Sequence, residues 1–224
     1  MKTGLRAALS SVVGLVILGV ALFLSAGTLN YWQAWVFIAV FAFGTIISSR
    51  YLARTAPAAL QRRKRGGPRA ETRMVQKFIV TAALLGGLTM MAFSAIDHRF
   101  RWSSVPTAVS LVGVVAIAAG LGMMTLVIVQ NHYAAATVTV ETGQKVATHG
   151  LYRFVRHPMY AANVIMMVGV PLALGSYWGL FLLIPVILAL VFRILDEETL
   201  LTQELAGYRE YTQRVRYRLI PYVW

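Results

Sequence analysis

The sequence predicts an all-α fold: a polytopic membrane helix bundle of about six transmembrane segments, followed by a cytosolic C-terminal helix. Apolar residues make up 58% of the 224 residues and only 13% are charged, about half the charged share of a typical soluble domain. The apolar residues form six long stretches, and the basic residues fall between alternate stretches. These three observations exclude a single soluble core.

The apolar stretches define the expected helices. They span residues 7–24, 32–47, 78–96 and 105–129, and then the two halves of the run 159–192. A helix needs about 20 apolar residues to cross the hydrocarbon core, so each of the first four is suited to cross it. Residues 175–179 divide the last run into halves of about 16 residues, which predicts a short helical hairpin. Its prolines, Pro171 and Pro185, are tolerated inside a bundle.

The first stretch has two interpretations. Lys2 and Arg6 precede it, as basic residues precede the apolar core of a signal peptide. The stretch is long, however, and no clear small-x-small cleavage site separates it from the next one. We therefore expect residues 1–26 to be retained as a membrane helix.

The basic residues predict the orientation. There are 21 Lys and Arg against 8 Asp and Glu, a net charge of +13. Nineteen of the 21 lie in the N-terminal tail, in residues 50–77, in residues 130–158 and after residue 192. The positive-inside rule places these segments and both termini in the cytoplasm. The run Arg62–Arg65 is then a topology determinant that contacts anionic lipid, and we expect no nucleic-acid partner.

Several kinds of site are excluded. The chain has no cysteine, which removes disulfides, Cys-ligated metals and thiol nucleophiles. Its four histidines lack zinc-motif spacing, and it has no Walker loop, no Gly-x-Gly-x-x-Gly after a strand and no Gly-x-Ser-x-Gly elbow. We expect neither a metal site nor a soluble dinucleotide-binding domain.

Polar residues concentrate on both sides of the predicted hairpin, in residues 130–160 and 193–224. The hairpin would bring the two segments together. We therefore divide the chain into residues 1–129, with four transmembrane helices, and residues 130–224, which carry the candidate site.

The first polar segment, residues 144–160, leads directly into an apolar stretch. Pro158 suits the first turn of a helix, and Gly150 permits close backbone approach to a ligand. Arg156 and His157 would lie at the helix N-terminus, where free N–H groups and the dipole favour a carboxylate or phosphate. The alternative is an interfacial cluster of Tyr and Arg without a ligand.

In the second segment, Arg193 and Glu197 are four residues apart and share a helix face. Such a pair is often only structural, but an Arg with three acids, Asp196–Glu198, at the mouth of a membrane bundle favours function. The apolar residues that follow recur at helical spacing and predict an amphipathic helix on the membrane or on the bundle: Leu200, Leu201, Leu205, Tyr208 and Tyr211. We expect its tyrosines to serve packing.

Three ordered motifs resemble the isoprenylcysteine carboxyl methyltransferase family. They are Val146–Tyr160 (VATHGLYRFVRHPMY), residues 193–201 (RILDEETLL), and Gly207–Tyr211 followed by Val215 and Pro221. The resemblance covers roughly residues 130–224, whereas the first four stretches resemble only generic membrane helices. Phospholipid N-methyltransferases share the general plan.

The resemblance implies an integral membrane enzyme that transfers a methyl group from S-adenosylmethionine to a carboxylate, or another headgroup, of a lipophilic substrate. It implies a catalytic pair, Arg193 and Glu197, and no metal. The implied cofactor contacts are Gln144, Gly150, Leu151, Tyr152, Arg156, His157, Pro158, Tyr160 and Glu198. Eukaryotic members usually have His where Gln144 stands. The expected partners are a lipophilic small molecule or lipidated substrate and membrane lipids, at a cytoplasmic site in a bacterial inner membrane.

The chemistry of methyl transfer agrees with these residues. A methyl sulfonium is already activated and a carboxylate is ionised at pH 7, so the protein has to supply alignment and charge placement. We predict that Arg193 holds the acceptor carboxylate and that Glu197 fixes Arg193 or balances the sulfonium.

Other functions remain open at this point. One is a membrane reductase of the sterol-reductase type that uses NADPH, with Tyr152 or Tyr160 as proton donor; another is a phospholipid amine N-methyltransferase. A non-catalytic scaffold is a third, while a transporter would need paired repeats that the chain lacks. The sequence does not identify the acceptor, the oligomeric state or the role of the N-terminal helices.

Overall fold

The computed structural model describes residues 2–64, 66–134 and 137–224, with side chains from residue 12 onward except Lys64. The predicted positions of the Lys2, Arg6, Lys64 and Arg65 side chains therefore lie outside the described part. Eight α-helices are described there: α1 (Lys2–Ala26), α2 (Trp32–Thr55), α3 (Pro57–Lys64), α4 (Met74–Phe100), α5 (Thr107–Gln130), α6 (Pro158–Ala173), α7 (Leu183–Glu204) and α8 (Tyr208–Arg214). The described residues also form two short 3₁₀ helices, and they contain no strand. The all-α prediction is therefore confirmed for them.

The apolar helices make this an integral membrane protein. Among the described residues, α2, α4, α5 and the segment Trp178–Glu204, which contains α7, are long and apolar enough to cross a membrane. Val12–Ala26 in α1 and the whole of α6 are apolar but shorter. Four candidate spans thus stand where the sequence predicted about six segments. The second arm of the hairpin is also longer than expected, because α7 has 22 residues and continues through the acidic residues to Glu204.

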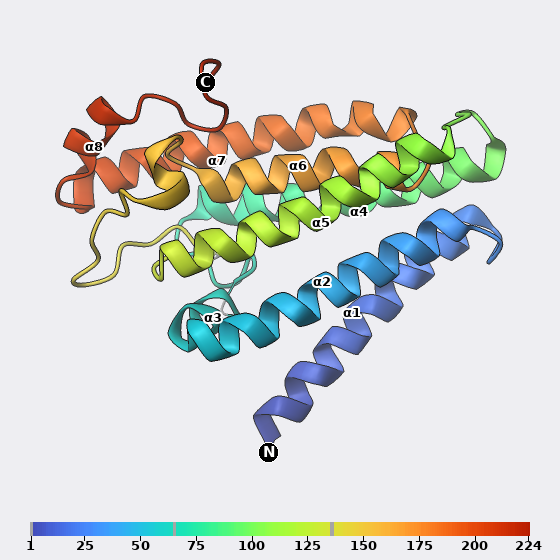
Figure 1. The fold of residues 1–224 in the computed structure, drawn as a ribbon, viewed down its shortest axis with the longest axis horizontal. Coiled ribbons are helices and arrows are strands. Elements are labelled where there is room, and N and C mark those ends of the chain that lie inside the picture. Colours follow the sequence, from blue (N-terminus) through green and yellow to red (C-terminus); the bar gives the residue numbers. More distant parts are fainter. Residues whose placement is uncertain (1, 65, 135–136) are drawn as a thin grey trace.

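Helix α6 packs antiparallel along α5 through small residues (Figure 1). A Cβ atom on Gly113 would lie 2.4 Å from the backbone nitrogen of Ala173, and one on Gly120 would lie 2.9 Å from the carbonyl oxygen of Ala162. Helices in a membrane associate largely by such close packing. The contact sets the first turn of α6 beside the last turn of α5, where the polar segments begin.

The main core lies between the long helices. It is formed by apolar side chains from six helices, among which Leu22, Phe37, Met90, Ile117 and Val170 are buried. Outside this core many large apolar side chains are exposed on α1, α2, α4, α5 and α7. Such extensive exposed apolar surface is what a lipid environment covers.

Polar contacts tie the short turns together at one end of the bundle. Asp97, at the end of α4, accepts hydrogen bonds from the backbone nitrogen of Ser103 (2.7 Å), from its hydroxyl (2.6 Å) and from the hydroxyl of Ser176 (2.5 Å). The Tyr31 hydroxyl donates to the carbonyl of Leu174 (2.5 Å). These contacts join the three turns that connect α1 to α2, α4 to α5 and α6 to α7.

The longer polar segments gather at the opposite end, around α3, the start of α6 and α8 (Figure 1). The expected amphipathic helix over residues 200–211 is not continuous: α7 ends at Glu204, and α8 begins at Tyr208. Gly207 between them has a φ of +81°, a left-handed conformation that glycine adopts readily. The break turns α8 back toward the bundle.

Replacement of Gly113 by valine tests the close packing of α5 on α6. The new side chain would collide with the α6 backbone, and overpacking of this kind costs about 1–3 kcal/mol. We expect a lower melting temperature for Gly113→Val in detergent, measured by intrinsic fluorescence. Gly122→Val is the matched control on the same helix, because a Cβ there meets nothing within 4 Å. Equal losses for both variants would contradict this packing.

Candidate active site

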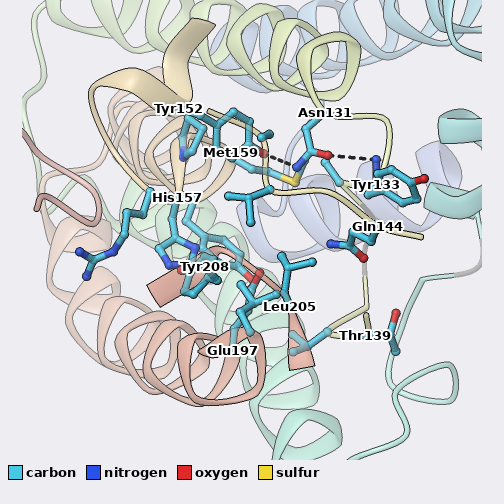
Figure 2. A pocket seen from close by; sticks show the side chains of 18 of the residues that line it. Asn131, Tyr133, Thr139, Gln144, Tyr152, His157, Met159, Glu197, Leu205 and Tyr208 are labelled. Atoms are coloured by element: carbon cyan, nitrogen blue, oxygen red, sulfur yellow. Dashed lines mark hydrogen bonds between the residues drawn. The ribbon is translucent and has the colours of Figure 1, made fainter. Parts of the chain in front are cut away.

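A cavity of about 250 Å³ lies at the polar end of the bundle. Its walls come from α3, the segment after α5, the start of α6, α7 and α8 (Figure 2). Of the eleven predicted site residues, eight line it: Gln144, Tyr152, Arg156, His157, Pro158, Tyr160, Arg193 and Glu197. The other three, Gly150, Leu151 and Glu198, are not among its lining residues. Residues from both predicted polar segments therefore line one cavity.

Gly150 and Leu151 lie behind the cavity wall, against the end of α5. The φ of Gly150 is +59°, and a Cβ on it would lie 2.4 Å from the side-chain oxygen of Gln130. The Leu151 backbone nitrogen donates a hydrogen bond to the same oxygen (2.9 Å). Both residues thus fix the 3₁₀ helix Gly150–Arg153 against α5.

This 3₁₀ helix presents Tyr152 to the cavity. Its hydroxyl accepts a hydrogen bond from the Asn131 side chain (3.1 Å), and its carbonyl accepts one from the Tyr211 hydroxyl (2.7 Å). Burial raises the pKa of Tyr152 to about 12, so the phenol is neutral at physiological pH. Tyr152 is a fixed, uncharged wall of the cavity.

Glu198 joins the C-terminal tail to the start of α6. Its carboxylate accepts hydrogen bonds from Arg156 Nε (2.6 Å) and Arg218 Nε (2.8 Å), and it lies 3.1 Å from His157 Nε2. The backbone nitrogens of Arg156 and His157 donate to the carbonyls of Tyr217 and Arg218 (2.9 Å each). Glu198 therefore organises the wall from outside the cavity.

The guanidinium of Arg193 is held by three partners from two other parts of the chain. Nη1 donates to the Gln76 side-chain oxygen (2.7 Å), Nη2 to Glu71 (2.9 Å) and Nε to the Tyr160 hydroxyl (2.9 Å). The Glu71 side chain is only 1% exposed. All three guanidinium nitrogens are thus engaged by the protein itself.

Glu71 and Gln76 are site-supporting residues that the sequence reasoning missed. They precede and begin α4, which looked like a generic membrane helix. Gln76 also donates to the carboxylate of Asp196, and Arg73 forms an ion pair with it (2.7 Å). One signal was available: Glu71 is the single acid within the basic segment 50–77.

Glu197 points a second charge at the cavity. Its carboxylate accepts a short hydrogen bond from the Tyr160 hydroxyl (2.5 Å), so the predicted pair Arg193 and Glu197 is joined through Tyr160. Within the residues that the structure describes, Glu197 forms no ion pair. A partly buried carboxylate of this kind is suited to a cationic ligand.

Tyr208, which we expected to serve packing, also lines the cavity. Figure 2 shows it near Glu197, across the cavity from Asn131. Its hydroxyl is buried and has no hydrogen-bond partner within the described part of the chain, and burial raises its pKa. A buried unsatisfied hydroxyl is uncommon and calls for a partner, which a ligand would provide.

Two comparisons with known proteins bear on this site. Residues 108–208 match the phospholipid methyltransferase family, a range that runs from α5 to the first residue of α8. A stretch of 95 residues is 35% identical to Delta(14)-sterol reductase TM7SF2 of Mus musculus, covering 39% of this chain and 22% of that protein. The chain therefore spans about a fifth of the length of this curated relative. The family match supports a membrane methyltransferase.

A double-mutant cycle tests whether Glu71 and Arg193 hold the site together. Loss of one partner of a buried ion pair costs about 3–5 kcal/mol. We expect Glu71→Leu and Arg193→Met each to lower the melting temperature strongly, and the double variant to lose less than the sum. The control Glu204→Gln removes an exposed acid of α7 and should melt like the wild type. Strict additivity would contradict the coupling.

Proposed function

We propose that the protein is an S-adenosylmethionine-dependent methyltransferase that modifies the headgroup of a lipophilic, membrane-embedded acceptor. One observation carries this proposal: the range that matches the phospholipid methyltransferase family contains Glu197 and most of the cavity wall around it. A carboxylate without an ion-pair partner in the described residues suits the positive charge of a methyl sulfonium. The resemblance of residues 146–160 and 193–221 favours a carboxylate as the methyl acceptor over an amine.

The cavity residues fit the chemical groups of this cofactor. Glu197 would balance positive charge, and the unsatisfied Tyr208 hydroxyl would donate to a polar group. The side-chain amides of Asn131 and Gln144 and the ring of Tyr152 line the same cavity and suit ribose hydroxyls and an aromatic base. When bound, the cofactor supplies a methyl group that is already activated on a positively charged sulfur.

The chain's own contribution is alignment. The Tyr160 hydroxyl donates to Glu197 and accepts from Arg193, so the carboxylate that faces the cavity has a fixed orientation. In place of a role for Arg193 as holder of the acceptor carboxylate, we propose that Arg193 acts through Tyr160 as a positioning residue. Its three nitrogens already have protein partners. Preorganised reactants account for much of the rate gain in such transfers.

The proposal includes a place in the cell. The basic segments flank the polar end of the bundle, and by the positive-inside rule this supports a cavity on the cytoplasmic side, which we propose to be that of a bacterial inner membrane. There the cofactor would enter from water, while the acceptor would reach the cavity from the membrane.

A second candidate is an NADPH-dependent membrane reductase. The 35% identity to the Delta(14)-sterol reductase favours it. Tyr152, a neutral phenol on the cavity wall, would be its proton donor. The two candidates differ in the cofactor that they bind, and a binding measurement separates them.

Binding of three nucleotides by the purified protein tests the proposed function. By calorimetry in detergent we expect S-adenosylmethionine and S-adenosylhomocysteine to bind and NADPH not to bind. In Glu197→Gln, affinity for the sulfonium cofactor should fall about tenfold or more. Affinity for the uncharged thioether product should change much less, because it lacks the positive sulfur.

The control for this measurement is Glu210→Gln, which removes an exposed acid of α8 and should bind both ligands normally. If NADPH binds and neither S-adenosylmethionine nor S-adenosylhomocysteine does, the result favours the reductase. If Glu197→Gln lowers the affinities for S-adenosylmethionine and S-adenosylhomocysteine equally, Glu197 does not interact with the sulfonium.

A further inference from the structure

We propose that Arg63 on α3 binds the anionic headgroup of the lipid acceptor, a carboxylate or a phosphate. The inference rests on the proposed function, since it assumes that the lipid at this cavity is the methyl acceptor. It assigns the substrate-binding cation to a helix outside the matched range 108–208 and outside the segments in which the sequence placed the site.

The guanidinium of Arg63 has only weak partners. It lines the cavity, with Nη1 3.1 Å from the sulfur of Met159 and Nη2 2.8 Å from the sulfur of Met124. Thioether sulfur is a poor hydrogen-bond acceptor. Burial lowers the pKa of Arg63, which reflects a charge that water solvates poorly. A partly desolvated cation without a counter-charge is costly, and an anionic ligand would neutralise it.

The other cationic side chains near the cavity differ from Arg63. Arg193 is paired with Glu71, and Arg156 with Glu198, while Lys145 is exposed to water. Within the described chain, Arg63 has no carboxylate within ion-pair distance. Among the described cationic side chains of the cavity, Arg63 is therefore the one that is half-buried and has no carboxylate within ion-pair distance.

The expected role of the basic run Arg62–Arg65 as a lipid-contacting determinant thus divides between its residues. Arg62 forms an ion pair with Glu141 (2.7 Å) and braces the segment after α5. Arg63 turns to the cavity instead. Two adjacent arginines on one short helix thus have different roles, and a count of charges along the sequence does not distinguish them.

Arg63 lies where the cavity meets an apolar cluster. Met124 and Met159 pack on buried Leu52, Ala56 and Ile128 at the polar ends of α2 and α5. An amphiphile with its chain along these helices would bring its headgroup to the guanidinium. Arginine forms paired hydrogen bonds with carboxylate and phosphate, and the flexible methionine side chains can rearrange around a ligand.

The two unpaired charges then divide the cavity by function. Glu197 on α7 would attract the cationic cofactor, and Arg63 on α3 would attract the anionic acceptor. Each charge excludes the wrong reactant from its part of the cavity by repulsion. This arrangement would place the cationic cofactor beside the anionic acceptor, in position for transfer of the methyl group.

Binding of three amphiphiles with the same alkyl chain tests this proposal. The probes are hexadecanoate, hexadecyl phosphate and hexadecanol, titrated without cofactor into the full-length protein in a neutral, non-ionic detergent. We expect Arg63→Gln to weaken binding of the anionic probes about tenfold or more, and binding of the alcohol less than twofold. Arg63→Lys keeps the charge but loses the paired donors of the guanidinium, so its affinity for the anionic probes should lie between those of the wild type and Arg63→Gln. Tighter binding of one anion by the wild type identifies the headgroup.

The matched control is Arg54→Gln, which removes one exposed charge from the last turn of α2 and should bind all probes normally. S-adenosylhomocysteine binding, measured separately on each variant, reports that the fold is intact. The proposal is overturned if Arg63→Gln binds the anions like the wild type, if it loses the alcohol equally, or if the wild type does not prefer the anions. Failure of the wild type to bind S-adenosylhomocysteine would count against the methyltransferase alone.

Discussion

The structure of the site depends on one buried guanidinium. Arg193 on α7 reaches Glu71 just before α4, Gln76 in the first turn of α4 and Tyr160 on α6, so three separate parts of the bundle meet at one side chain. A buried charge is tolerated only when its partners are in place, and this requirement fixes how the helices meet. The orientation of Glu197, set through Tyr160, follows from it.

At the polar end of the bundle, charges in ion pairs hold the structure together, and charges without such a pair line the candidate binding site. Glu71 and Glu198 each form ion pairs with arginine and hold helices and tail together. Glu197 and Arg63 line the cavity, and no opposite charge pairs with either one in the described residues. Acidic residues are scarce, 8 against 21 basic residues. An acid without an ion-pair partner is therefore a stronger indication of a binding function than a basic residue without one.

The sequence predicted the helical membrane bundle and the two polar segments that supply most of the cavity wall, because apolar runs and local motifs are properties of short segments. It did not predict the support from Glu71 and Gln76 or the turn of Arg63 toward the cavity, since these depend on how distant helices pack. It also predicted one continuous helix over residues 200–211, whereas α7 ends at Glu204 and α8 begins at Tyr208, with Gly207 in a left-handed conformation between them. Glu198 shows the same limit: it does not line the cavity itself, but it holds Arg156 and His157 of the cavity wall together with Arg218 of the C-terminal tail.

An experimental structure of the protein with S-adenosylhomocysteine would show whether Arg193 supports the cavity and Glu197 faces the cofactor in it. We expect ligand density between Glu197 and Tyr208, with Arg193 still bound to Glu71 and Tyr160. Density outside the cavity, or an Arg193 that leaves Glu71 to contact the ligand, would contradict this expectation.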